Sequence, residues 1–90
     1  MAVTTFRFRV TGRVQGVGYR YFALMEAQAN GVFGYAKNLP DGSVEVVAEG
    51  APAAVQAFEA RLREGPAFAR VALVDKEPLA ARGDQGFHIR

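Results

Sequence analysis

The sequence GRVQGVGYR, residues 12–20, separates a pattern typical of a β-strand from one typical of a helix. Upstream of it, apolar residues alternate with polar ones, which is the period of two expected for a strand with one buried face. The alternating apolar residues are Phe6, Phe8 and Val10. We therefore predict a strand that ends at Gly12 and is followed by a glycine-rich turn.

A helix is predicted directly after this turn. Phe22, Met25 and Ala29 recur with the spacing of one helical face, and Asn30 followed by Gly31 is a common helix stop. We expect Phe22 and Met25 to belong to the core. The turn supplies no Ser, Thr, Asp or Asn at the expected cap position, so the first backbone N–H groups of the helix lack a capping side chain.

Uncapped N–H groups, glycines and an arginine are the components of an anion site. Glycine lets the backbone approach a ligand closely, and the positive end of a helix favours phosphate or carboxylate. Arg20 adds a permanent charge and two parallel donors. The stretch equally fits a plain tight turn with a solvated arginine. It matches neither GxxxxGK[ST] nor GxGxxG, because Tyr21 occupies the place of the third glycine.

The length of 90 residues predicts a single domain, residues 1–90, with one core. The chain contains no cysteine, which excludes disulfides, a thiolate nucleophile and cysteine metal sites. No N-terminal apolar run resembles a signal peptide, and no segment approaches the roughly 20 apolar residues of a membrane span. We expect a soluble, cytoplasmic protein with no membrane partner.

The formal charge of +2 is too small to indicate bulk binding of nucleic acid. Its distribution is uneven, because four arginines and no acidic residue precede Glu26. These arginines are Arg7, Arg9, Arg13 and Arg20. The first strand and its loop are therefore locally positive, which favours an anionic partner. Arg7 and Arg9 are more simply explained as the solvent face of the strand.

The middle of the chain predicts a β-hairpin. Strands are expected over residues 32–38 and 43–49, and the sequence LPDG at residues 39–42 fits a three-residue turn that ends in a left-handed glycine. This register places Lys37 across from Glu45, an opposite-charge pair.

The second half of the chain predicts another helix and two more strands. The helix runs from residue 51 to a stop at residues 65–66, with Val55, Phe58 and Leu62 on its core face. A fourth strand contains Val71 and Leu73, and a short terminal strand covers residues 87–89. The order is βαββαβ with a short β added. It predicts a ferredoxin-like α+β sandwich, an antiparallel sheet with both helices on one face.

This topology places Asn38 beside the glycine-rich loop. Right-handed crossovers make the first two strands parallel, with the third strand between them. Their C-terminal ends then lie at the same edge of the sheet, so the loop of residues 12–19 is expected near the end of the second strand. Asn38 is the residue that ends that strand. An asparagine beside a hairpin also commonly bonds its own turn, and this alternative remains open.

Three motifs resemble the acylphosphatase family over nearly the whole chain: GRVQGVGYR at residues 12–20, GVFGYAKN at residues 31–38 and LPDGSVEVVAEG at residues 39–50. The chain departs from the family's usual residues at Tyr19, Tyr35 and Ala36, where phenylalanine, tryptophan and valine are common. The resemblance implies hydrolysis of the carboxyl–phosphate bond of acyl phosphates to a carboxylate and inorganic phosphate, without a metal or other cofactor.

The resemblance also implies roles for individual residues. Arg20 would hold the phosphoryl oxygens, and Asn38 would position the attacking water. Backbone N–H groups of five loop residues would assist: Gln15, Gly16, Val17, Gly18 and Tyr19. Because an amide is not a base at neutral pH, the proton of the water would pass to the substrate's own phosphate. The expected partners are a small-molecule acyl phosphate and inorganic phosphate, with no nucleic acid, and we expect a monomer.

Two other functions fit the same fold. A ferredoxin-like sheet can stack RNA bases on aromatic residues of its open face, where Phe33 and Tyr35 are expected, but the neighbouring strands lack the usual aromatic signature. The chain could also be a non-catalytic anion-binding or regulatory module. His88, the only histidine, is expected to point to solvent rather than to bind a metal.

Overall fold

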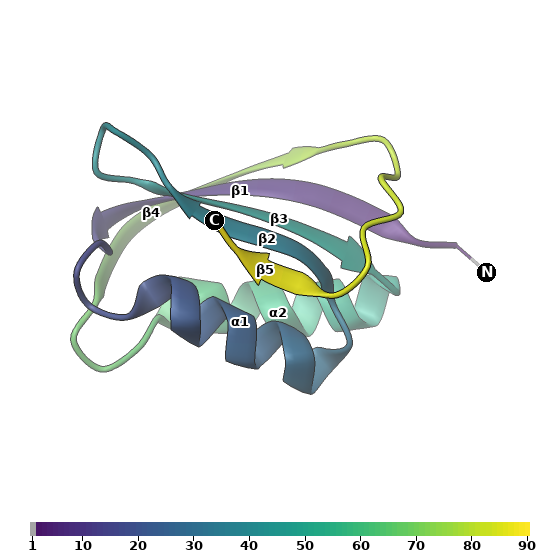
Figure 1. Ribbon diagram of the computed structural model, residues 1–90, viewed down its shortest axis with the longest axis horizontal. Helices are drawn as coiled ribbons and strands as arrows, with labels where there is room; N and C mark the ends of the chain where they lie inside the picture. The colour runs from purple at the N-terminus through teal and green to yellow at the C-terminus, as the bar shows by residue number, and fades with distance from the viewer. Residues whose placement is uncertain (1) are drawn as a thin grey trace.

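A computed structural model describes residues 2–90 as a five-stranded sheet with two helices on one face (Figure 1). The elements in chain order are β1 (Thr4–Arg13), α1 (Tyr19–Asn30), β2 (Phe33–Asn38), β3 (Val44–Gly50), α2 (Pro52–Glu64), β4 (Arg70–Pro78) and β5 (Phe87–Ile89). The predicted ferredoxin-like α+β sandwich is confirmed. Within residues 2–90, neither helix combines the length and apolar character needed to cross a membrane.

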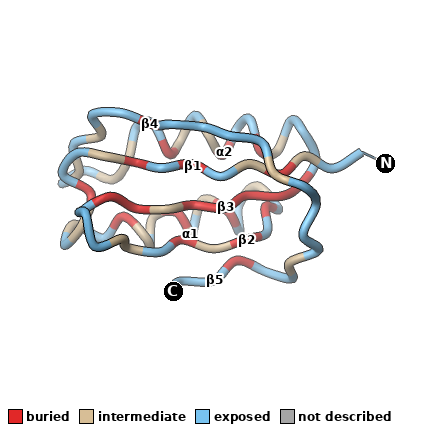
Figure 2. The backbone as a smooth tube through the Cα atoms, turned by 90° about the horizontal axis from the view of Figure 1, so that it is seen from above, coloured by how far each residue is buried: buried red, intermediate tan, exposed pale blue. Residues whose placement is uncertain are grey.

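The strand order across the sheet is β4-β1-β3-β2-β5. β1 and β2 both pair antiparallel with β3, so they are parallel to each other with β3 between them, as predicted. β5 pairs parallel with β2, which makes the sheet mixed. Residues 79–86 carry the chain from one edge of the sheet to the other around the end where β1 begins (Figure 2). β5 therefore runs in the direction of β1, which the residue pattern alone did not predict.

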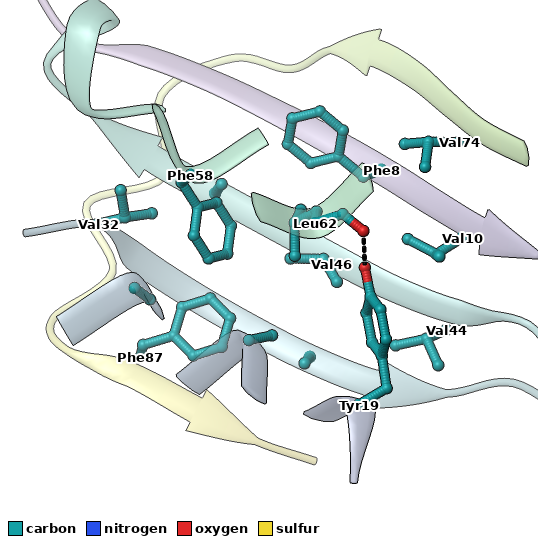
Figure 3. Packing of buried hydrophobic residues seen from close by; sticks show 14 of the residues in the cluster. Phe8, Val10, Tyr19, Val32, Val44, Val46, Phe58, Leu62, Val74 and Phe87 are labelled. Carbon is teal, nitrogen blue, oxygen red and sulfur yellow. Dashed lines mark hydrogen bonds between the residues drawn. The ribbon is translucent and has the colours of Figure 1, made fainter. Parts of the chain in front are cut away.

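The core lies between the sheet and the helices (Figure 3). Phe8 and Val10 of β1 are fully buried, and the predicted core face of α2 is confirmed. The buried residues of α2 are Val55, Phe58 and Leu62. Burial of each large apolar side chain contributes about 1.5–3 kcal/mol, so this face holds α2 against the sheet.

The buried face of α1 differs from the prediction. Its buried residues are Tyr19, Ala23 and Ala27, whereas Met25 is 48% exposed and Phe22 is only partly buried. The expectation that Met25 belongs to the core was wrong. Hydrophobic spacing weights large side chains, but the two alanines let α1 lie close to the sheet, so the helix is rotated relative to the predicted face.

The β2–β3 hairpin has the predicted register. Lys37 lies opposite Glu45, and the backbone N–H of Leu39 donates to the carbonyl of Ser43 at 2.9 Å. Gly42 has a φ of 93°, in the left-handed region predicted for the end of the turn. The end of β2 is therefore fixed by local backbone bonds.

A buried carboxylate anchors residues 79–86. Glu49 accepts hydrogen bonds from the Thr5 hydroxyl at 2.5 Å and from the backbone N–H groups of Arg82 at 2.6 Å and Gly83 at 2.8 Å. These bonds, led by that from Thr5, lower the pKa of Glu49. Thr5 and Glu49 pair with each other on the face of the sheet opposite the helices. Both are buried, because the connection to β5 is bonded across that face.

Candidate active site

The glycine-rich loop and the end of β2 lie at the same end of the sheet (Figure 1). They line one small hollow of about 190 Å³, to which β5 also contributes. The lining residues are Val14, Gly16, Gly18, Tyr19, Arg20, Tyr21, Asn38 and Ile89. The structure therefore brings together five of the predicted site residues: Gly16, Gly18, Tyr19, Arg20 and Asn38. Gln15 and Val17 lie outside this lining.

Two left-handed glycines shape the loop. Gly16 has a φ of 74° and Gly18 a φ of 78°, values that residues with a side chain rarely adopt. A Cβ built at either position meets no other atom within 4 Å, so the space in front of both is open. Gly18 is the N-cap of α1, and no side chain caps it. This helix end thus presents uncapped backbone donors to the hollow.

Tyr19 anchors the first turn of α1. Its side chain is buried, and its hydroxyl donates to the backbone carbonyl of Leu62 at 2.7 Å (Figure 3). In a continuing helix that carbonyl would accept from the N–H of residue 66, but Pro66 has none. The Tyr19 hydroxyl therefore caps the last turn of α2, and burial raises its pKa. The missing N–H at Pro66 is the sequence signal for this contact, which was not predicted.

Gln15 joins the loop to the β2–β3 turn. Its Nε2 donates to the carbonyl oxygens of Leu39 at 2.8 Å and Ser43 at 2.9 Å. Since Leu39 directly follows Asn38, these two bonds fix Asn38 relative to the loop. The sequence prediction considered only the backbone of Gln15. Val17, the other predicted residue outside the hollow, packs against the core.

Arg20 is the charged group of the hollow. Its Nη1 donates to the backbone carbonyl oxygen of Arg90 at 2.9 Å. Among residues 2–90, no Asp or Glu side chain lies within ion-pair distance of its guanidinium, whereas five other arginines each pair with at least one. Those five are Arg7, Arg9, Arg61, Arg63 and Arg82. No Asp or Glu side chain among the described residues therefore compensates the positive charge of Arg20.

Asn38 lies on the helix side of the sheet. It follows Gly34 and Ala36 at the period of two, and it pairs with buried Val44. In the part of the chain that the structure describes, no hydrogen bond joins its carboxamide to another residue. The turn is instead bonded by the side chains of Gln15 and Asp41. The structure therefore shows no bond from Asn38 to its own turn among the described residues, and Asn38 lines the hollow.

Among residues 2–90, neither His88 nor the acidic side chains build a metal centre. His88 is exposed, with its Nε2 2.8 Å from the carbonyl oxygen of Gln85. Across the described residues, no three His, Cys, Asp or Glu side chains gather closely enough to hold a metal ion together.

The open face of the sheet has little free aromatic surface. The Tyr35 ring lies under the guanidinium groups of Arg90 and Arg82, whose Cζ atoms are 4.1 and 5.5 Å from the ring centroid. The Tyr35 hydroxyl donates to Glu45 at 2.7 Å. Phe33 is exposed, as predicted. Base stacking would need a second free ring beside Phe33, but the Tyr35 ring is already covered by Arg82 and Arg90.

Comparisons with known proteins agree on one family. The acylphosphatase family model matches residues 6–89. An acylphosphatase from Thermus thermophilus is 52% identical over 80 residues, covering 89% of this chain and 91% of the relative. One from Deinococcus radiodurans is 49% identical over 80 residues, covering 89% and 92%. The crystal structure of an acylphosphatase from Bacillus subtilis matches with a TM-score of 0.94 and 39% identity, covering 97% of this chain and 98% of that chain. The chain therefore belongs to the acylphosphatase family of hydrolases.

Proposed function

We propose that the protein hydrolyses the carboxyl–phosphate bond of acyl phosphates to a carboxylate and inorganic phosphate, without a metal ion. One observation carries this proposal beyond family membership. Arg20, which has no Asp or Glu side-chain partner among the described residues, shares a hollow of about 190 Å³ with an uncapped helix end and the unpaired amide of Asn38. A dianionic phosphoryl group complements the first two features, and a water molecule complements the third.

In this proposal the phosphoryl oxygens are bound by Arg20 and by backbone N–H groups of the loop. The N–H donors are those of Gln15, Gly16, Val17, Gly18 and Tyr19. Charge-assisted hydrogen bonds of this kind contribute about 1.5–3 kcal/mol each, and bonds that strengthen as charge moves onto the phosphoryl oxygens lower the barrier. The positive end of α1 also stabilises negative charge on the phosphoryl oxygens.

Asn38 is proposed to orient the attacking water through its carboxamide oxygen. The water oxygen forms a bond to phosphorus while the bond from phosphorus to the acyl oxygen breaks, and the carboxylate leaves with the electron pair. The amide does not ionise at neutral pH, so the proton of the water passes to a phosphoryl oxygen of the substrate. Phosphoryl transfer depends mainly on positioning and charge stabilisation, so a site with one arginine and one amide is sufficient.

Further parts of the proposal concern the protein as a whole. A monomer is proposed as the active form. Residues 1–90 are proposed to form one domain, because both helices and all strands share one core. The absence of cysteine suits a reducing compartment and supports a cytoplasmic location.

The test is direct hydrolysis of benzoyl phosphate by the purified protein, in the presence of a metal chelator and with inorganic phosphate as a competitor. We expect turnover that the chelator does not reduce and that phosphate inhibits competitively. Phosphate binding without turnover would contradict the enzymatic proposal and indicate a non-catalytic anion-binding module. Loss of activity with the chelator, restored by added metal, would contradict metal independence. A salt-sensitive shift with single-stranded RNA would indicate nucleic-acid binding instead.

A further inference from the structure

Two exposed apolar side chains lie beside the polar groups of the hollow. Tyr21 of α1 is 62% exposed and Ile89 of β5 is 42% exposed. Both line the hollow that contains Arg20 and Asn38. Single exposed apolar residues are ordinary on protein surfaces, but here two from different elements meet at one small cavity. The proposed chemistry at phosphorus uses neither of them.

The exposure of Ile89 follows from its position at the edge of the sheet. Strand alternation places it on the same face as Phe87, which is only 7% exposed and packs against Phe58 with ring centroids 5.8 Å apart. This is the face that the helices cover. Ile89 is nevertheless left open, and it lines the hollow.

Tyr21 reaches the hollow from the first turn of α1. It follows Arg20 directly, while the ring of Tyr19 on the other side of Arg20 is buried in the core. Within residues 2–90 the Tyr21 hydroxyl makes no hydrogen bond to another residue. The side chain is therefore largely exposed and held by no hydrogen bond to a described residue, and it offers an aromatic surface to a ligand.

We propose that Tyr21 and Ile89 form the binding site for the acyl group, and that the enzyme prefers acyl phosphates with an aromatic or extended apolar acyl group over acetyl phosphate. This inference rests on the proposed function. When Arg20 and the loop hold the phosphoryl group, the acyl carbon is one oxygen atom away. A ring attached to that carbon would extend out of the small hollow at its rim, beside Tyr21 and Ile89.

The experiment compares kcat/KM for benzoyl phosphate and acetyl phosphate in the unmodified protein and in Tyr21→Ala, Ile89→Ala and the double variant. Loss of apolar contact lowers the benzoyl value more than the acetyl value, so the benzoyl-to-acetyl ratio is expected to fall roughly tenfold in the double variant. Tyr21→Phe retains the ring and is expected to keep the ratio. Met25→Ala, at another exposed apolar residue of α1 outside the hollow, is the matched control and is expected to leave both substrates unchanged.

The outcomes separate the two proposals. If the unmodified protein hydrolyses neither substrate, the proposed function fails and the acyl site fails with it. If it hydrolyses both but the ratio is the same in the double variant, only the acyl site is overturned. An equal loss for both substrates, together with weaker inhibition by phosphate, would show that the substitutions disturb Arg20, and would also overturn it. Circular dichroism and thermal unfolding confirm that each variant is folded.

Discussion

The guanidinium of Arg20 is tied to the β5 edge of the sheet by a 2.9 Å hydrogen bond from Nη1 to the main-chain oxygen of Arg90. The backbone N–H of Arg90 in turn donates to the carbonyl of Ala36 at 2.8 Å. Ala36 lies two residues before Asn38 in β2. Residue 90 therefore sets the position of the charged group relative to the strand that carries the amide.

Deletion of Arg90 is expected to lower kcat/KM for benzoyl phosphate roughly tenfold, because Arg20 loses the acceptor that orients it. Arg90→Ala is the matched control. It retains the backbone carbonyl and removes only the side chain that stacks on Tyr35. Equal activities for the deletion and the alanine variant would show that the backbone contact does not matter for turnover.

Arg20→Lys is expected to lose most of the activity, by about two decades or more, although the positive charge is kept. A lysine cannot present the parallel donors of a guanidinium. Steady-state assays with benzoyl phosphate measure the loss. Arg13→Lys, at an exposed arginine outside the hollow, serves as the control and should remain active. Turnover close to that of the unmodified protein in a folded Arg20→Lys variant would contradict the assignment of Arg20.

Asn38→Ala is expected to reduce kcat while the inhibition constant for inorganic phosphate changes much less. The substitution removes the partner of the water and leaves the proposed phosphate donors in place. Measuring turnover and competitive inhibition on the same preparation separates the two effects. If both quantities change by the same factor, Asn38 acts on the structure of the site and not on the water.

Gln15→Ala is expected to lower both stability and turnover. It removes the two bonds from Nε2 to the carbonyls of Leu39 and Ser43, at a cost of about 1–2 kcal/mol in the free energy of unfolding. It also frees the loop from the turn that follows Asn38, so kcat should fall even at temperatures where the variant is fully folded. Urea unfolding and assays at low temperature test both effects. Reduced stability with unchanged kcat would show that the bonds stabilise the fold without positioning Asn38.

Glu49→Gln is expected to destabilise the protein in a pH-dependent way. The folded state lowers the pKa of Glu49, so its carboxylate stabilises the fold above the unfolded pKa of about 4.3, and that contribution is lost as pH falls through the folded value. The loss at pH about 7 is expected to be about 1–3 kcal/mol and to shrink at pH about 3. Urea unfolding at both pH values measures it. Glu64→Gln, at an exposed carboxylate, is the control. A pH-independent difference would contradict this account.

Periodicity and topology predicted much of the fold, for reasons that particular residues illustrate. The alternation in β1 and the spacing of Val55, Phe58 and Leu62 report burial directly, because large side chains define both core faces. The same method failed for α1, where Ala23 and Ala27 face the core and carry almost no hydrophobic signal. Small residues can pack closely against a sheet, but a pattern based on large apolar side chains does not detect them.

The placement of Asn38 near the loop followed from strand order alone, because handedness rules fix where strand ends lie. The side-chain contacts that hold this arrangement could not be predicted from strand order. Gln15 reaches a turn 24 residues away, and Tyr19 reaches a carbonyl 43 residues away. Such side-chain bonds depend on the three-dimensional approach of segments that no local pattern describes. The one local signal was Pro66, whose missing N–H leaves a carbonyl of α2 in need of a donor.

The short length of β5 has a consequence for motion at the candidate site. β5 has three residues and pairs only with β2, so it can detach without opening the rest of the sheet. Its detachment releases Arg20 and removes Ile89 from the hollow together. We therefore expect local opening of this edge strand to perturb the proposed site, and hydrogen exchange at residues 87–90 to report that opening before global unfolding begins.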